Sequence, residues 1–248
     1  MPDLSPQLPN GSVGIVGFGA FGQLIAEHLR PHFKISVFDI APDIARADAL
    51  DVSVLPFEAV AECPIVVLAI PVGRMREVVA DLALLIKPGT LVVDVGSVKV
   101  EPVAIMRELL PETVGIVGTH PLFGPQSARS GIHGRRIAIC PVRGTHLGVA
   151  ALCRKVGLEV IMTTPDEHDR DAAQVQGLTH FIANLLVKMD LRQTRMTTRS
   201  FEALMSAVEM VRHDAPEVIQ AILGTNPYAG DVLKRFKSLA STLDVNRL

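Results

Sequence analysis

A glycine-rich turn between a predicted strand and a predicted helix constrains the fold of this chain more than any other feature. From Val13 the sequence reads VGIVGFGAFGQLIAEHL, with three glycines in GxGxxG spacing. The first glycine permits a tight turn, the second lets the backbone approach a pyrophosphate, and the third lets the helix pack on the strand. Because the N–H groups at a helix start attract phosphate, the segment predicts a dinucleotide site. The expected cofactor contacts here are Gly17, Phe18, Gly19, Ala20, Phe21 and Gly22.

Short apolar runs alternate with helical patterns along the first two thirds of the chain. Continuous apolar runs indicate strands buried on both faces, and their alternation with helices predicts right-handed βαβ units in a mostly parallel sheet. We therefore expect a Rossmann-type, doubly wound α/β domain over residues 1–164. Its strands are predicted at residues 12–16, 34–38, 64–69, 90–95, 113–118, 136–140 and 159–163.

After Thr164 the strand signals stop and helical patterns follow. An apolar stripe at spacings of three and four residues predicts one long helix that packs this stripe into protein. The stripe consists of Val175, Leu178, Ile182, Leu185 and Met189. Further helices are predicted at residues 200–212, 216–223 and 230–243. Residues 165–248 are thus expected to form an all-α domain, and its small core favours a homodimer through these helices.

Composition favours a folded, soluble protein. The chain is 48% hydrophobic and 20% charged with a net charge of −2, so no basic excess points to nucleic acid. No run approaches the roughly 18 apolar residues that span a bilayer, and the start MPDLSPQLPN has no signal-peptide pattern. The three cysteines lack metal-ligand spacing, which favours reduced thiols and no metal site. We expect a cytoplasmic protein with no nucleic-acid or membrane partner.

The ends of two further predicted strands extend the cofactor site. Asp39 follows the second strand, 17 residues after the last glycine of the turn. A carboxylate there can accept hydrogen bonds from the adenosine ribose and repels a 2′-phosphate, which favours NAD over NADP. The alternative is that Asp39 only caps the following turn, and the nearby Arg46 would soften the preference. Ala69, Ile70 and Pro71 are expected to line the nicotinamide side of the cleft.

Two polar loops follow the next predicted strands at the same edge of the sheet. The first, DVGSVK, contains Ser97 and Lys99, which are expected to contact the cofactor, and the second, THPLFGPQS, contains Thr119, His120 and Gln126. A histidine at a strand end is suited to act as general base for an alcohol proton, and Ser97 could hydrogen-bond the same hydroxyl. The alternative for His120 is a structural hydrogen bond.

These motifs together resemble the prephenate/arogenate dehydrogenase family. GxGxxG, DVGSVK, THPLFGPQS and HDRDAAQVQGLTHF (residues 168–181) occur in the family's order and spacing. By this resemblance His120 is the catalytic histidine, Ser97 is its partner at the substrate hydroxyl, and His180 binds substrate. Residues Thr119 and Gln126 of the same loop are expected substrate contacts, with Gln126 standing where several relatives have an acid. The family also has a basic substrate ligand in its helical region, for which we choose Arg199.

The helical pattern adds a separate argument for His180. Ala173, Gly177, His180 and Asn184 share the face opposite the apolar stripe, and small and polar residues suit a wall that faces a cleft.

The resemblance implies a reaction as well as a site. It is the oxidation and decarboxylation of prephenate or arogenate, an anionic small molecule, with hydride transfer to NAD(P)⁺ on the route to tyrosine. Two alternatives remain open. One is another Rossmann reductase of the β-hydroxyacid or imine type, which shares the first domain. The other is a non-catalytic NAD-sensing protein.

Overall fold

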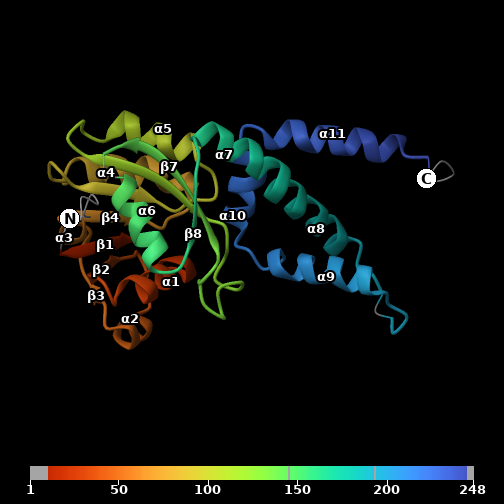
Figure 1. The fold of residues 1–248 in the computed structure, drawn as a ribbon, viewed down its shortest axis with the longest axis horizontal. Coiled ribbons are helices and arrows are strands. Elements are labelled where there is room, and N and C mark those ends of the chain that lie inside the picture. Colours follow the sequence, from red (N-terminus) through yellow and green to blue (C-terminus); the bar gives the residue numbers. More distant parts are fainter. Residues whose placement is uncertain (1–10, 145, 193, 245–248) are drawn as a thin grey trace, which may run out of the picture. The chain divides into compact units, whose positions relative to one another are not determined.

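The computed structural model describes residues 11–144, 146–192 and 194–244 (Figure 1). The prediction about the first ten residues lies outside this range. The chain divides into two compact units, Met1–Pro165 (unit 1) and Asp166–Leu248 (unit 2). The sequence places this boundary one residue earlier, after Thr164.

One twisted sheet forms the centre of unit 1. All neighbouring strands are parallel except the antiparallel pair β6–β7. In the described residues the strand order is β3-β2-β1-β4-β5-β6-β7-β8. Its first six strands have the Rossmann order, in which ligands bind outside the carboxyl ends beside the switch point between β1 and β4. The predicted doubly wound, mostly parallel sheet is therefore confirmed. The strands are β1 Ser12–Val16, β2 Lys34–Phe38, β3 Ser53–Val54, β4 Ile65–Leu68, β5 Leu91–Asp94, β6 Gly115–Pro121, β7 Arg136–Arg143 and β8 Glu159–Met162.

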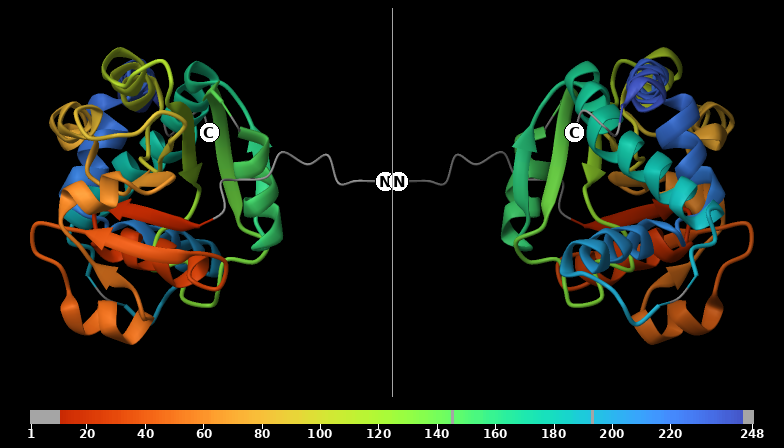
Figure 2. Two further views of the ribbon diagram at one scale, coloured as in Figure 1. Left: turned by 90° about the vertical axis from the view of Figure 1, so that its left-hand side faces the viewer. Right: turned by 90° about the vertical axis from the view of Figure 1, so that its right-hand side faces the viewer.

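Helices cover both faces of this sheet (Figure 2). One face packs against α1 (Ala20–Leu29), α2 (Ile44–Leu50) and α6 (His146–Lys155). The other packs against α3 (Phe57–Ala61), α4 (Met75–Ala83) and α5 (Val100–Leu109). Successive strand residues enter opposite cores, because side chains alternate along a strand. This explains why the central strands are apolar throughout.

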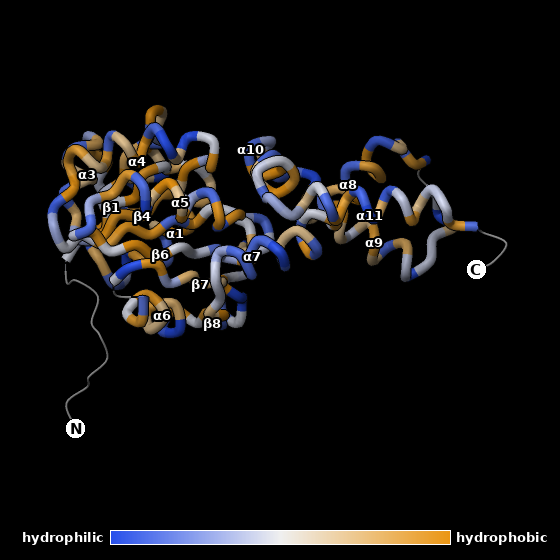
Figure 3. The backbone as a smooth tube through the Cα atoms, turned by 90° about the horizontal axis from the view of Figure 1, so that it is seen from above, coloured by the Kyte–Doolittle hydropathy of each residue, from blue (hydrophilic) through white to orange (hydrophobic). Residues whose placement is uncertain are grey.

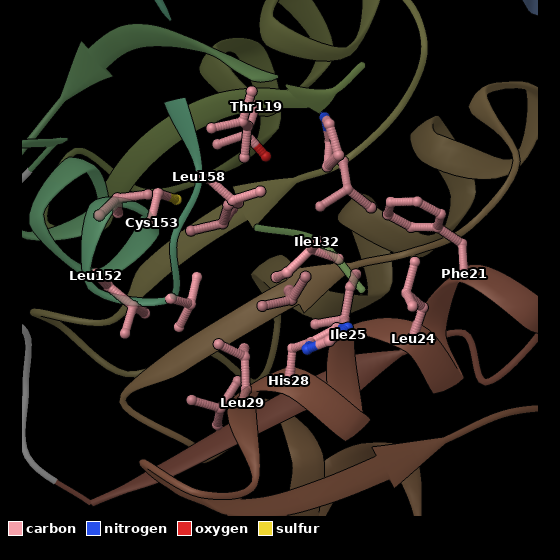
Figure 4. Close-up of a pocket in the computed structure, with 18 of the residues that line it drawn as sticks. Phe21, Leu24, Ile25, His28, Leu29, Thr119, Ile132, Leu152, Cys153 and Leu158 are labelled. Atoms are coloured by element: carbon pink, nitrogen blue, oxygen red, sulfur yellow. The ribbon is translucent and has the colours of Figure 1, made fainter. Parts of the chain in front are cut away.

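An apolar cavity of about 130 Å³ lies between α1, α6 and the sheet (Figure 4). Leu24 and Ile25 of α1 form part of its wall, and Leu152 and Cys153 of α6 form another part. Burial in this apolar wall raises the pKa of the Cys153 thiol to about 12, with a smaller opposing effect from the positive charge of Arg154.

We expect the Cys153 thiol to resist alkylation in the native protein. With a pKa of about 12, roughly one thiol in ten thousand is ionised near pH 8, and the thiolate is the reactive form. Iodoacetamide followed by peptide mass spectrometry should leave native Cys153 unmodified and modify it in the denatured chain. Because the folded pKa lies above the ordinary value of 9.0, this group's contribution to stability is complete below pH 9 and decreases as pH rises towards 12. Equal labelling of the native and denatured protein would contradict the assignment.

The described part of unit 2 is helical. The predicted long helix is two α-helices joined by a π-helical turn, and the other three predicted helices are present within a few residues of their expected bounds. No helix of the described residues is long and apolar enough to cross a membrane. The elements are α7 Pro165–Ala172, the π-turn η2 Ala173–Gly177, α8 Leu178–Lys188, α9 Arg199–Val211, α10 Pro216–Gln220, the π-turn η3 Ala221–Thr225 and α11 Ala229–Thr242.

Within the single chain, the face of the long helix that packs inward is the one opposite the apolar stripe. Val175 and Met189 of the apolar stripe are 68% and 62% exposed, whereas Gly177 and His180 on the opposite face are buried. Small residues allow close helix approach, and a Cβ built on Gly177 would lie 3.9 Å from the Cβ of Ala229 in α11. Figure 3 shows hydrophobic residues spaced along α8, α9 and α11. The apolar stripe is therefore partly exposed in the single chain, with Leu178 and Ile182 half-buried.

Candidate active site

The turn after β1 has a backbone that only glycine fits. Gly17 has a φ of +98°, and a Cβ there would lie 2.3 Å from the carbonyl oxygen of Ala69. A Cβ on Gly22 would lie 2.0 Å from the carbonyl oxygen of Gly17. The first glycine thus lets β1 and β4 approach at the switch point, and the third lets α1 pack against the turn.

The middle glycine leaves open space in front of the start of α1. A Cβ built on Gly19 would meet no atom within 4 Å. Gly19 is the N-cap of α1, no side chain caps this helix start, and its first turn has no acidic residue. Free N–H groups and the positive end of the helix dipole therefore face this space. The residues present fit the pyrophosphate of a dinucleotide.

Asp39 is tied to the glycine turn by its carboxylate. One oxygen accepts a hydrogen bond from the Phe18 N–H at 2.6 Å, and the other accepts from the Ala41 N–H at 2.9 Å. Asp39 therefore caps the following turn. A carboxylate has about four acceptor positions, so these two bonds leave capacity for ribose hydroxyls. The side chain of Phe18 itself is buried, and only its backbone faces the turn.

The remaining predicted cofactor residues lie at the same edge. Ala69 and Ile70 follow β4 and are half-buried, and Pro71 is exposed. Phe21 is half-buried in α1 and Ala20 is exposed at its first position.

A buried network joins the ends of β5 and β6. Lys99, which has no exposed surface, donates hydrogen bonds to the Asp94 carboxylate and, at 2.6 Å, to the carbonyl oxygen of Thr119. The Thr119 hydroxyl in turn donates to the Asp94 carbonyl oxygen at 2.6 Å. A buried charge needs such compensation. Lys99 and Thr119 therefore hold two strand ends together. The contact of Lys99 with cofactor and that of Thr119 with substrate stay predictions.

His120 is the penultimate residue of β6, whereas the sequence predicts that this strand ends at Gly118. The strand continues because residues 119–121 pair with residues 137–139 of β7. By strand alternation His120 shares the face of Gly118, where a Cβ would lie 3.0 Å from Val103 of α5. His120 is 5% exposed as a residue, so its ring is largely shielded from bulk water.

The strand order places His120 and the glycine turn on one edge. β1, β4, β5 and β6 are successive parallel neighbours, so His120 lies three strand spacings from the turn, or about 14 Å. A dinucleotide laid along the carboxyl edge can cover this length. Ser97 is half-buried in the turn after β5, the strand next to β6, and Gln126 is half-buried in the loop between β6 and β7.

In unit 2, His180 uses both ring nitrogens within that unit. Its Nδ1 lies 2.9 Å from the carbonyl oxygen of Gln176, and its Nε2 lies 2.9 Å from the Asp214 carboxylate. Arg199 is the first residue of α9 and is exposed.

Sequence reasoning missed two carboxylates. Asp214 lies 34 residues after His180, and no local pattern connects them. Asp94 did carry a signal, because an acid at the end of a buried strand with a lysine five residues later suggests a buried ion pair. No group of three or more potential metal ligands occurs among the described side chains.

The strand order and the open space beside Gly19 define unit 1 as a dinucleotide-binding α/β domain. Known proteins place it more closely. The family model for the nucleotide-binding domain of prephenate dehydrogenase matches residues 25–147. The 4-amino-4-deoxyprephenate dehydrogenase of Streptomyces pristinaespiralis is 30% identical over 236 residues, which cover 88% of this chain and 78% of that protein. The chain belongs to the prephenate/arogenate dehydrogenase family.

Two further relatives are matched over very different shares of their own length. Chloroplastic arogenate dehydrogenase 1 of Arabidopsis thaliana is 29% identical over 242 residues, or 90% of this chain, but the chain spans only 37% of that protein. The crystal structure of Aquifex aeolicus prephenate dehydrogenase with hydroxyphenyl propionate and NAD⁺ has a TM-score of 0.76 at 25% identity, covering 95% of this chain and 90% of that one. The likeness therefore includes the helical unit.

Proposed function

We propose that this protein oxidises and decarboxylates prephenate, arogenate or both, with a nicotinamide cofactor as hydride acceptor, on the route to tyrosine. Family membership supports this reaction. The observation that carries the proposal is the position of His120 at the carboxyl edge, three strands from the glycine turn. Rossmann proteins without a base at that edge would bind the cofactor but lack this proton acceptor.

His120 acts as general base in this proposal. A nicotinamide cofactor held at the glycine turn would supply the hydride acceptor for the ring carbinol carbon. His120 takes the proton of the same hydroxyl, and Ser97 orients the hydroxyl by a hydrogen bond. The ring carboxylate then leaves as CO₂, and the electrons of the broken C–C bond make the ring aromatic. The phenolate oxygen that results takes the proton back from His120. The low exposure of His120 limits competition from water for these contacts.

The cofactor is NAD in this proposal, with NADP as the alternative. A 2′-phosphate on the ribose would meet the Asp39 carboxylate. Arg46, the residue that would soften this repulsion, forms an ion pair with Glu27 at 2.7 Å. Its charge is therefore already engaged in the protein.

The proposed substrate ligands are Gln126, His180 and Arg199. Gln126 lies in the loop that follows His120, and His180 and Arg199 in unit 2 supply groups for an anionic substrate. Both ring nitrogens of His180 are engaged, so His180 binds substrate only if substrate shares or replaces one of these bonds, such as the bond to Asp214. An uncharged Gln126 in the place of an acid lowers attraction to the ammonium group of arogenate, so we expect prephenate to be preferred.

The test is an assay of reduced nicotinamide absorbance with each substrate crossed against NAD⁺ and NADP⁺. A third substrate, 4-amino-4-deoxyprephenate, is included because of the Streptomyces relative. We expect the highest kcat/KM for prephenate with NAD⁺. Binding of NAD⁺ without turnover of any of the three substrates would favour the NAD-sensing alternative, and turnover only of simple hydroxyacids would favour the reductase alternative.

We also propose a homodimer through the helices of unit 2, because the stripe of Val175, Leu185 and Met189 is exposed in the single chain. Burying such a face in a second copy removes apolar surface from water. Leu185→Glu should convert a dimer to a monomer in sedimentation velocity, whereas Lys188→Glu, which changes an exposed polar position of the same helix, should leave it dimeric. A monomeric wild-type protein at micromolar concentration would contradict the proposal.

A further inference from the structure

A polar cleft of about 330 Å³ runs beside the cofactor turn in unit 1. One wall is the outer side of α1 from Ala20, its first residue, to His28, and this stretch includes Gln23 and Glu27. The opposite wall is the loop between β6 and β7, from Pro125 to Gly131. The cleft thus reaches the helix start that faces the open space at Gly19.

The charges in this cleft do not cancel. Glu27 is engaged by Arg46 at 2.7 Å, and the first turn of α1 has no acidic residue. Arg129 also lines the cleft, is exposed, and forms no ion pair with another described residue. The cleft therefore has one positive charge in excess, carried by the loop that faces α1.

We infer that Arg129 binds the pyrophosphate of the dinucleotide from the side opposite the N–H groups of α1. The inference rests on the proposed function, because it takes the glycine turn as the cofactor site. A guanidinium presents a planar set of donors that matches phosphate oxygens, and a charge-assisted pair of this kind is stronger than a neutral hydrogen bond. The loop between β6 and β7 would thereby contact the bound cofactor.

The position of Asp39 separates this role from recognition of a 2′-phosphate. A residue for the 2′-phosphate has to meet the ribose beside the end of β2, where Asp39 bonds Phe18 and Ala41. Arg129 instead lines the same cleft as α1, whose first turn is the phosphate end of the site. A residue that binds the pyrophosphate affects the affinity for NAD⁺ and NADP⁺ alike, whereas a residue that recognises the 2′-phosphate affects only NADP⁺.

The test compares Arg129→Gln, which removes the charge, with Arg129→Lys, which keeps it. Dissociation constants are measured by calorimetry for NAD⁺, NADP⁺, ADP-ribose and adenosine. Arg154→Gln removes an exposed arginine of α6 outside the cleft and is the matched control. Thermal denaturation of all variants checks that each remains folded.

Arg129→Gln should weaken the binding of NAD⁺ and ADP-ribose about ten-fold and leave the affinity for adenosine unchanged, because only the first two carry the pyrophosphate. Arg129→Lys should lose less affinity for NAD⁺ and ADP-ribose than Arg129→Gln does, and Arg154→Gln should bind all four ligands as the wild type does. Unchanged NAD⁺ and ADP-ribose affinity in a folded Arg129→Gln variant would overturn the inference, and so would a loss confined to NADP⁺. A wild-type protein that binds neither dinucleotide would instead refute the proposed function.

Discussion

Replacing His120 with asparagine should reduce kcat by about 10²–10⁴, the usual contribution of a general base, while the affinity for NAD⁺ stays at the wild-type value. The amide keeps a polar group of similar size on the strand but cannot take the hydroxyl proton at neutral pH. Steady-state kinetics with the preferred substrate and calorimetry with NAD⁺ measure the two quantities.

A control for this substitution is His32→Asn, which changes an exposed histidine after α1, away from the carboxyl ends of β5 and β6. It should leave both kcat and cofactor affinity unchanged. If His120→Asn retains wild-type turnover, the ring is structural and the reaction uses another base. If it loses NAD⁺ affinity and thermal stability together, the substitution has disturbed the strand.

The second large effect separates two glycines of one turn. Gly22→Ala should destabilise the protein by about 1–3 kcal/mol, the usual cost of forcing extra volume into packed structure, because its Cβ would lie 2.0 Å from the Gly17 carbonyl oxygen. Gly19→Ala should lower the melting temperature much less, because its Cβ meets no protein atom within 4 Å. Gly19→Ala should still weaken NAD⁺ binding about ten-fold or more, since the methyl group enters the space that the pyrophosphate needs.

Thermal denaturation and NAD⁺ calorimetry on both variants make the comparison. The account requires that the two glycines differ: one substitution acts on stability, the other on binding. A Gly19→Ala variant with full NAD⁺ affinity would show that the cofactor backbone does not approach this turn.

The sheet could be predicted from sequence because its signals are local. Each central strand is a continuous apolar run, and the glycine turn fixes where the first βαβ unit begins. The two-residue strand Ser53–Val54 gave no such signal and was missed. The extension of β6 to Pro121 could not be predicted either, because it depends on antiparallel pairing with β7, whose register no local pattern encodes.

Side-chain environments were harder to predict than elements. Lys99 reads as a polar loop residue, yet its ammonium group is buried because Asp94 and Thr119 supply partners from two strands. In unit 2 the period of the apolar stripe was visible, but the packed face was set by the small residues opposite Ala229. Periodicity identifies candidate faces of a helix, and only the tertiary partner decides between them.

The most direct test of the central claim is a crystal structure of the protein with NAD⁺ and a substrate analogue that keeps the ring hydroxyl. The account predicts one ring nitrogen of His120 at about 3 Å from that hydroxyl oxygen, with the nicotinamide ring stacked against the carbinol carbon. A hydroxyl bonded elsewhere, with the His120 ring separated from it by other protein atoms, would contradict the account.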